Sequence, residues 1–156
     1  MADEKSIQKQ VISQMAALCS CSEQCSPDIR KKIIAVGLTD EEIEKILEYL
    51  KKEKFIDDKR YASAYATEKL RINRWGRIKI RYYLHTKGLS AEIIETGLES
   101  LDEKNYLDIL LKTMKEKAKK SGGKSKFEKI GQIIRFAQSR GFEPELIHRY
   151  INEAMK

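Results

Sequence analysis

The sequence predicts an all-α protein made of three tandem three-helix repeats that form an elongated, curved array. Only two prolines and eight glycines occur in 156 residues, and no segment shows the alternation of a β-strand. Three glycines, Gly37, Gly88 and Gly141, lie 51 and 53 residues apart. Apolar residues stand eight positions before and one, six and ten positions after each glycine: Ile29, Leu38, Ile43 and Leu47; Ile80, Leu89, Ile94 and Leu98; Ile133, Phe142, Ile147 and Ile151.

A register that recurs at this spacing is typical of repeat proteins, in which each unit contacts mainly its neighbours. We place the three units at residues 1–55, 56–102 and 103–156. A unit of this size buries little surface by itself, so we expect it to depend on the adjoining unit. The alternative is one bundle of six to nine helices with a shared interior, in which the matches reflect only a common helix–glycine–helix pattern.

The first repeat contains three predicted helices. Apolar residues at helical spacing indicate the first over residues 6–19. The second spans residues 26–37 and opens with Ser-Pro-Asp, which places Ser26 at the N-cap and proline at the first helical position. Thr39 and Glu42 form a capping box for a third helix that continues to Leu50.

The second repeat follows the same order. Asp57 is expected to cap a helix over residues 58–74, and Ile56 and Tyr61 stand at the positions of a hydrophobic staple. On this helix Tyr61, Tyr65 and Ile72 are predicted to share the apolar face. A glycine at position 76 separates it from a helix that ends near Thr86.

The remaining helices are predicted from apolar spacing alone. One begins after Ser90 and completes the second repeat. Those of the third repeat centre on residues 106–120, 127–137 and 144–151, and a basic loop over residues 121–126 joins the first two.

Positive charge is concentrated in the second repeat. The net charge of the whole chain is +7 and its pI is about 9.2, which favours a polyanionic or acidic partner. From Lys59 to Lys87, Glu68 is the only acid, and it stands among nine basic residues: Lys59, Arg60, Lys69, Arg71, Arg74, Arg77, Lys79, Arg81 and Lys87. Lysines between residues 112 and 126 form a further basic group, either a solvated face or a contact for phosphates or an acidic surface.

Helical spacing arranges the central arginines in stripes that lie apart from the apolar faces. We predict that these residues contact the partner: Arg60, Arg71, Arg74, Arg77 and Arg81, with Lys79 in support. The alternative is that they are only solvated.

The residues do not indicate an enzyme. No nucleophile with a base and no carboxylate pair can be assembled, so we expect no catalytic residue and no cofactor. Cys19, Cys21 and Cys25 are expected to be reduced thiols, because their number is odd and no export signal is present. A zinc site is not expected, because the candidates for a fourth ligand, His85 and His148, lie far away in sequence. Without a signal peptide or a membrane-spanning apolar run, we expect a soluble cytoplasmic monomer.

The central stretch resembles the RecX family, regulators that bind the bacterial RecA recombinase. The likeness is carried by four blocks: Phe55-Ile56-Asp57-Asp58, Arg60-Tyr61-Ala62, Gly76 with Ile80, and Lys87-Gly88-Leu89. The resemblance implies a modulator that lies in the groove of the RecA–DNA filament and limits filament extension, ATPase activity and strand exchange.

The residues also permit a second function. Three-helix units resemble helix-turn-helix DNA readers. The helix that carries Arg77 and Arg81 offers no Asn or Gln, so DNA binding, single- or double-stranded, would be insensitive to sequence.

Overall fold

The computed structural model describes residues 2–156, with side-chain surroundings from residue 5 onward. Every regular element in this part of the chain is helical, which confirms the all-α fold. In chain order these elements are α1 (Ala2–Cys21), α2 (Ser26–Ile34), α3 (Asp40–Lys52), α4 (Asp58–Glu68), the π-helix η1 (Lys69–Asn73), α5 (Arg77–Thr86), α6 (Ala91–Glu99), α7 (Glu103–Lys120), α8 (Lys126–Ser139) and α9 (Pro144–Ala154).

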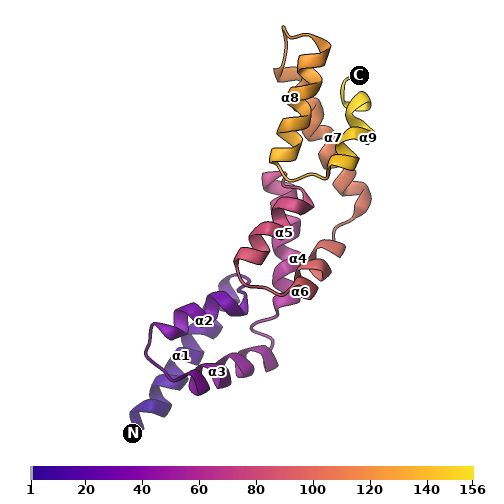
Figure 1. Ribbon diagram of the computed structural model, residues 1–156. Coiled ribbons are helices and arrows are strands. Elements are labelled where there is room, and N and C mark those ends of the chain that lie inside the picture. The colour runs from indigo at the N-terminus through magenta and orange to yellow at the C-terminus, as the bar shows by residue number, and fades with distance from the viewer. Residues whose placement is uncertain (1) are drawn as a thin grey trace.

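The helices follow one another along a curved rod with the two chain ends at opposite tips (Figure 1). The groups α1–α3, α4–α6 and α7–α9 succeed one another along it, so the elongated, curved array is confirmed and a single bundle is wrong. None of the helices in the described residues is both long and apolar enough to cross a lipid bilayer.

Local signals explain why the helices begin and end where they do. Thr39 and Glu42 form the expected capping box, and the Asp57 side chain accepts a hydrogen bond from the Arg60 N–H at 3.0 Å. The three anchor glycines adopt left-handed φ values of +88°, +94° and +92°, which residues with a Cβ rarely adopt.

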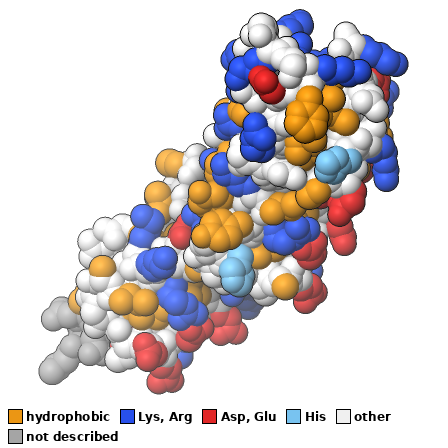
Figure 2. Space-filling model, turned by 45° about the horizontal axis from the view of Figure 1, so that its top comes forward, with side chains coloured by type: hydrophobic (Ala, Val, Ile, Leu, Met, Phe, Trp, Pro, Cys, Tyr) orange, Lys and Arg blue, Asp and Glu red, His pale blue; other side chains and the backbone are white. Residues whose placement is uncertain are grey.

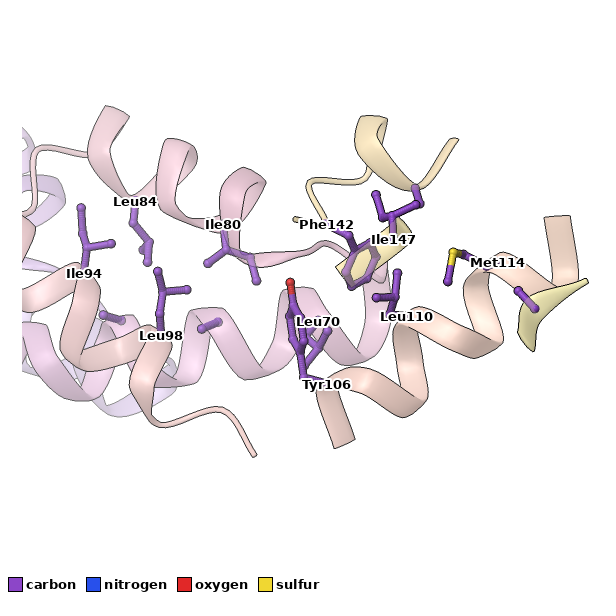
Figure 3. Packing of buried hydrophobic residues seen from close by; sticks show 14 of the residues in the cluster. Leu70, Ile80, Leu84, Ile94, Leu98, Tyr106, Leu110, Met114, Phe142 and Ile147 are labelled. Carbon is purple, nitrogen blue, oxygen red and sulfur yellow. The ribbon is translucent and has the colours of Figure 1, made fainter. Parts of the chain in front are cut away.

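The buried side chains form two cores. One cluster lies within α1–α3, and Ile56, just before α4, completes it. The other runs without a break through α4–α6 and α7–α9, so that Leu70, Tyr106 and Phe142 meet between the two groups (Figure 3). The second and third groups therefore form one body, whereas the first has its own interior. The expected staple is wrong, because Ile56 and Tyr61 pack in different clusters.

Close backbone contacts join the second group to the third. The Gly76 N–H donates to the Arg140 carbonyl at 2.7 Å, and the Ile78 N–H donates to the Gly141 carbonyl at 3.0 Å. A Cβ on Gly76 would overlap the Gly141 backbone, and a Cβ on Gly141 would overlap Lys79. Both glycines are needed here because the two chain segments touch.

The first group is held to the second by polar contacts. Asp58 accepts hydrogen bonds from the Ser26 N–H at 2.7 Å and the Ser26 hydroxyl at 2.5 Å, and Lys87 pairs with Asp28 at 3.1 Å. The expected N-cap at Ser26 is wrong. Cys25 occupies that position and its side chain makes no capping bond, so Asp58 of α4 satisfies the free N–H instead.

Cys25 is fully buried, and it packs in the core of the second and third groups although it belongs to the first. Burial raises the pKa of its thiol from 9.0 to about 11. Below pH 11 the raised pKa lowers the fraction of the thiol that is ionised. At pH 8 this fraction is about a hundred times smaller than for a thiol with a pKa of 9.0. Because Cys25 is also fully buried, it should be alkylated much more slowly than the exposed Cys21.

Mass spectrometry after timed iodoacetamide treatment measures both rates. Urea that unfolds the chain should abolish the difference. Equal rates of alkylation for Cys21 and Cys25 in the folded chain would mean that the packing of Cys25 against the second and third groups opens in solution.

Candidate binding surface

The predicted helix over residues 58–74 is wrong at its end. It changes at Lys69 into the π-helix η1, and Arg74 adopts a left-handed φ of +55°. A wider π turn shifts every later side chain around the helix axis. Ile72 consequently leaves the predicted apolar face and is 60% exposed.

Two hollows meet at Ile72. One, of about 650 Å³, follows α4 and is lined by Arg60, Ser63, Thr67, Arg71 and Ile72 among others. The other, of about 300 Å³, lies between η1, α7 and α8 and includes Arg74, Lys117, Lys120 and Arg140. We call the two together the η1 groove. It crosses the junction between the second and third groups, which share one core and hold its walls in place.

The charge of the η1 groove is positive. Its lining carries Arg60, Arg71, Arg74, Lys117, Lys120 and Arg140, against the carboxylates of Glu68 and Glu116. Figure 2 shows Lys and Arg side chains gathered at the end of the molecule formed by α7–α9, with few Asp and Glu among them. An exposed isoleucine within such a basic surface favours a macromolecular partner that supplies both carboxylates and apolar side chains.

Three of the six predicted contact residues line this groove. Arg71 is exposed and makes no ion pair with the described residues. Arg60 pairs with Glu23 at 2.7 Å, and Arg74 pairs with Glu116. Ion pairs at a surface contribute little stability, so a carboxylate of a partner can replace either one.

Arg77 lies elsewhere and has an internal role. Its side chain is 18% exposed and bonds to Glu143 at 2.7 Å and to Glu103, and its guanidinium lies 3.8 Å from the centroid of the Tyr106 ring. Burial is the largest single influence and opposes its charge, but the hydrogen bonds and charges of Glu143, Tyr106 and Glu103 together outweigh burial and raise the pKa of Arg77.

The backbone of Arg77 belongs to the same network. Its N–H donates to the Tyr106 hydroxyl at 2.9 Å, and that hydroxyl donates to Glu143. Burial, and then the bond to Glu143, raise the pKa of Tyr106, so the phenol keeps the proton that it donates.

The last two predicted residues face other surroundings. Arg81 pairs with Glu95 at 2.7 Å, and the Lys79 ammonium lies 4.8 Å from the centroid of the Trp75 ring. The structure thus divides the predicted face between the η1 groove, an internal network and two further surfaces. A contact with a partner stays a prediction for each residue.

Among the groove residues that sequence reasoning did not predict are Ile72, Lys117, Lys120 and Arg140. Lys117 and Lys120 belong to the basic segment between residues 112 and 126, for which the sequence allowed either a solvated face or a binding surface. Nothing local marks Ile72, because its exposure depends on the π turn.

An open, basic groove on an array of three-helix units is typical of one class of protein, which acts by binding another macromolecule. Comparison with known proteins narrows the class. A family model described as "RecX, second three-helix domain" matches residues 57–98, which contain α4, η1, α5 and all but the last residue of α6. The curated "Regulatory protein RecX" of Clostridium botulinum (strain Eklund 17B / Type B) is 30% identical over 129 residues, 81% of this chain and 60% of the relative. That of Clostridium tetani (strain Massachusetts / E88) is 32% identical over 126 residues, 80% of this chain and 57% of the relative.

Solved structures agree in fold. A crystal structure of RecX from Lactobacillus salivarius superposes with a TM-score of 0.89 at 20% identity and covers 99% of this chain and 98% of that one. Over about four fifths of its length the chain is similar to the curated RecX proteins, and its central group matches the RecX family model. It spans about 60% of the length of the curated relatives it matches.

Proposed function

We propose that this chain is a regulator of the RecA recombinase, chiefly an inhibitor, that binds in the groove of the RecA–DNA filament. In that position it limits filament extension, ATP hydrolysis and strand exchange. The observation that carries the proposal is the family match across α4–α6, the group that supplies much of the η1 groove. The curated relatives that the chain resembles are named regulatory proteins.

The shape and charge of the chain support this role. A long, shallow contact along a polymer requires reach and complementary charge, and it needs no enclosed pocket. The rod supplies reach, and the η1 groove supplies cations beside an exposed isoleucine. Such a rod would lie across neighbouring RecA subunits and bind one arrangement of those subunits more tightly than the others. Because a ligand stabilises the state that it binds more tightly, the filament would be held in that arrangement.

The proposal includes the cell compartment and the stoichiometry. A filament on DNA is met in the cytoplasm, and the elongated shape of the chain suits a contact with more than one subunit. We therefore propose that the chain acts there as a monomer and without a cofactor.

Strand exchange by the cognate RecA tests the function. Titrating the chain should inhibit both joint-molecule formation and DNA-dependent ATP hydrolysis, at no more than about one chain per RecA subunit. Co-sedimentation with RecA filaments and with bare DNA separates this role from general DNA binding. RecA that is unaffected by saturating chain, with bare DNA bound as tightly as filaments, would favour the DNA-binding alternative.

A further inference from the structure

A second surface of the central group joins aromatic rings to lysines. Trp75 and Tyr83 are stacked with ring centroids 4.8 Å apart, and Tyr82 meets Tyr83 edge-on at 5.3 Å. The Lys79 ammonium lies 4.8 Å from the Trp75 centroid, and that of Lys69 lies 5.2 Å from it. We call these five residues the aromatic–lysine cluster.

The lysines of this cluster differ from the arginines around them. Lys69 and Lys79 make no ion pair with a carboxylate in the described residues, whereas Arg74, Arg77 and Arg81 all do. Both residues are half-buried, and their charges are balanced only by the ring faces, whose attraction for a cation is modest. The cluster therefore presents two cations that an external anion can reach without displacing a carboxylate of the chain.

The rings are partly free as well. Trp75 packs against the core, but Tyr82 and Tyr83 belong to neither core cluster, and they are 62% and 39% exposed. Packing of Trp75 fixes the position of Tyr83, and Tyr83 in turn contacts Tyr82. The cluster is thus an anchored aromatic platform whose outer rings contribute little to folding.

We propose that the aromatic–lysine cluster binds single-stranded nucleic acid, with bases stacked on Tyr82 and Tyr83 and phosphates near Lys69 and Lys79. Aromatic rings beside cations are the features by which proteins bind single strands, because every unpaired base offers a π face. Bases of a duplex are already stacked on one another, so a duplex cannot use the rings. An acidic peptide could pair with the lysines but would leave the exposed tyrosines without a function.

Binding of a fluorescent oligothymidine, followed by anisotropy without RecA, tests the site. Tyr82→Ala should weaken binding about fivefold or more, because stacking on one ring contributes about that factor. Tyr82→Phe keeps the ring and should bind as the unchanged chain does. Tyr49→Ala, which removes a tyrosine of the first group that is 43% exposed, is the matched control and should have no effect.

Salt dependence tests the lysines. Replacing both Lys69 and Lys79 by Gln should reduce the slope of log affinity against log salt by about 1.4, at about 0.7 per phosphate of a single strand. Trp75 is the only tryptophan, so quenching of its fluorescence by the oligonucleotide reports binding at the cluster.

Unchanged affinity of Tyr82→Ala for the oligothymidine would overturn the proposal, and so would equal affinity of the chain for a duplex of the same length. The third such result is that polyglutamate displaces the oligothymidine and that its own binding is weakened equally by Tyr82→Ala. Because no RecA is present, none of them bears on the regulator function.

Discussion

Replacing Arg71, Lys117 and Lys120 together by Glu should raise the concentration of chain that half-inhibits RecA strand exchange at least tenfold. All three side chains line the η1 groove, and none has a carboxylate partner among the described residues. Each contact with an exposed charge contributes up to about 1 kcal/mol, and reversal turns attraction into repulsion. Because about 1.4 kcal/mol corresponds to a factor of ten, three reversals exceed that factor.

A control triple on α7, the helix that carries Lys117 and Lys120, separates the effect of the groove from that of the total charge. Lys104, Lys115 and Lys119 belong to α7, are exposed and do not line the groove. Changing them to Glu alters the net charge equally and should change half-inhibition by less than about threefold. Circular dichroism checks that both variants keep their helices. Equal losses in the two triples would assign the effect to long-range charge, and no loss in the groove triple would remove the groove from the contact.

Arg77→Met should lower the free energy of unfolding by about 3 kcal/mol, the usual cost of removing one partner of a largely buried ion pair. The change leaves Glu143 without its guanidinium and removes the cation over the Tyr106 ring. Methionine keeps much of the volume, so the loss reports the polar network rather than a cavity. The second and third groups should consequently separate more easily.

Arg81→Met is the comparison, because Arg81 lies one turn further along α5 and its side chain is 44% exposed. Its pair with Glu95 is a surface pair, so its loss should cost less than about 1 kcal/mol. Urea unfolding followed by Trp75 fluorescence measures both variants. Similar midpoints for the two would show that Arg77 is no more important to folding than a surface arginine. Reversing Arg77 is in any case an unsuitable test of partner binding, because the variant would destabilise the fold.

The sequence was sufficient for the helices because their signals are local. The caps at Thr39 and Asp57 use residues three positions away, and the anchor glycines mark turns that require a left-handed φ. The π-helix has no such signal. It packs between the second group and α7, and contacts across that junction decide where Ile72 points.

The sequence could not predict which arginines pair with carboxylates of the chain, for a related reason. Helical spacing shows that Arg77 and Arg81 share a stripe, but the partner of Arg77, Glu143, lies 66 residues further along the chain. Only the packed structure shows which arginine meets a carboxylate. The same limit applies to the η1 groove, whose cations come from two different groups.

Photocrosslinking from position 72 tests most directly whether the η1 groove contacts the RecA filament. With p-benzoylphenylalanine in place of Ile72, irradiation of chain bound to RecA–DNA filaments should yield a covalent adduct with RecA. The same group at Lys115, on α7 outside the groove, should yield much less. An inhibitory chain that forms no RecA adduct from position 72, or forms equal amounts from both positions, would contradict the account.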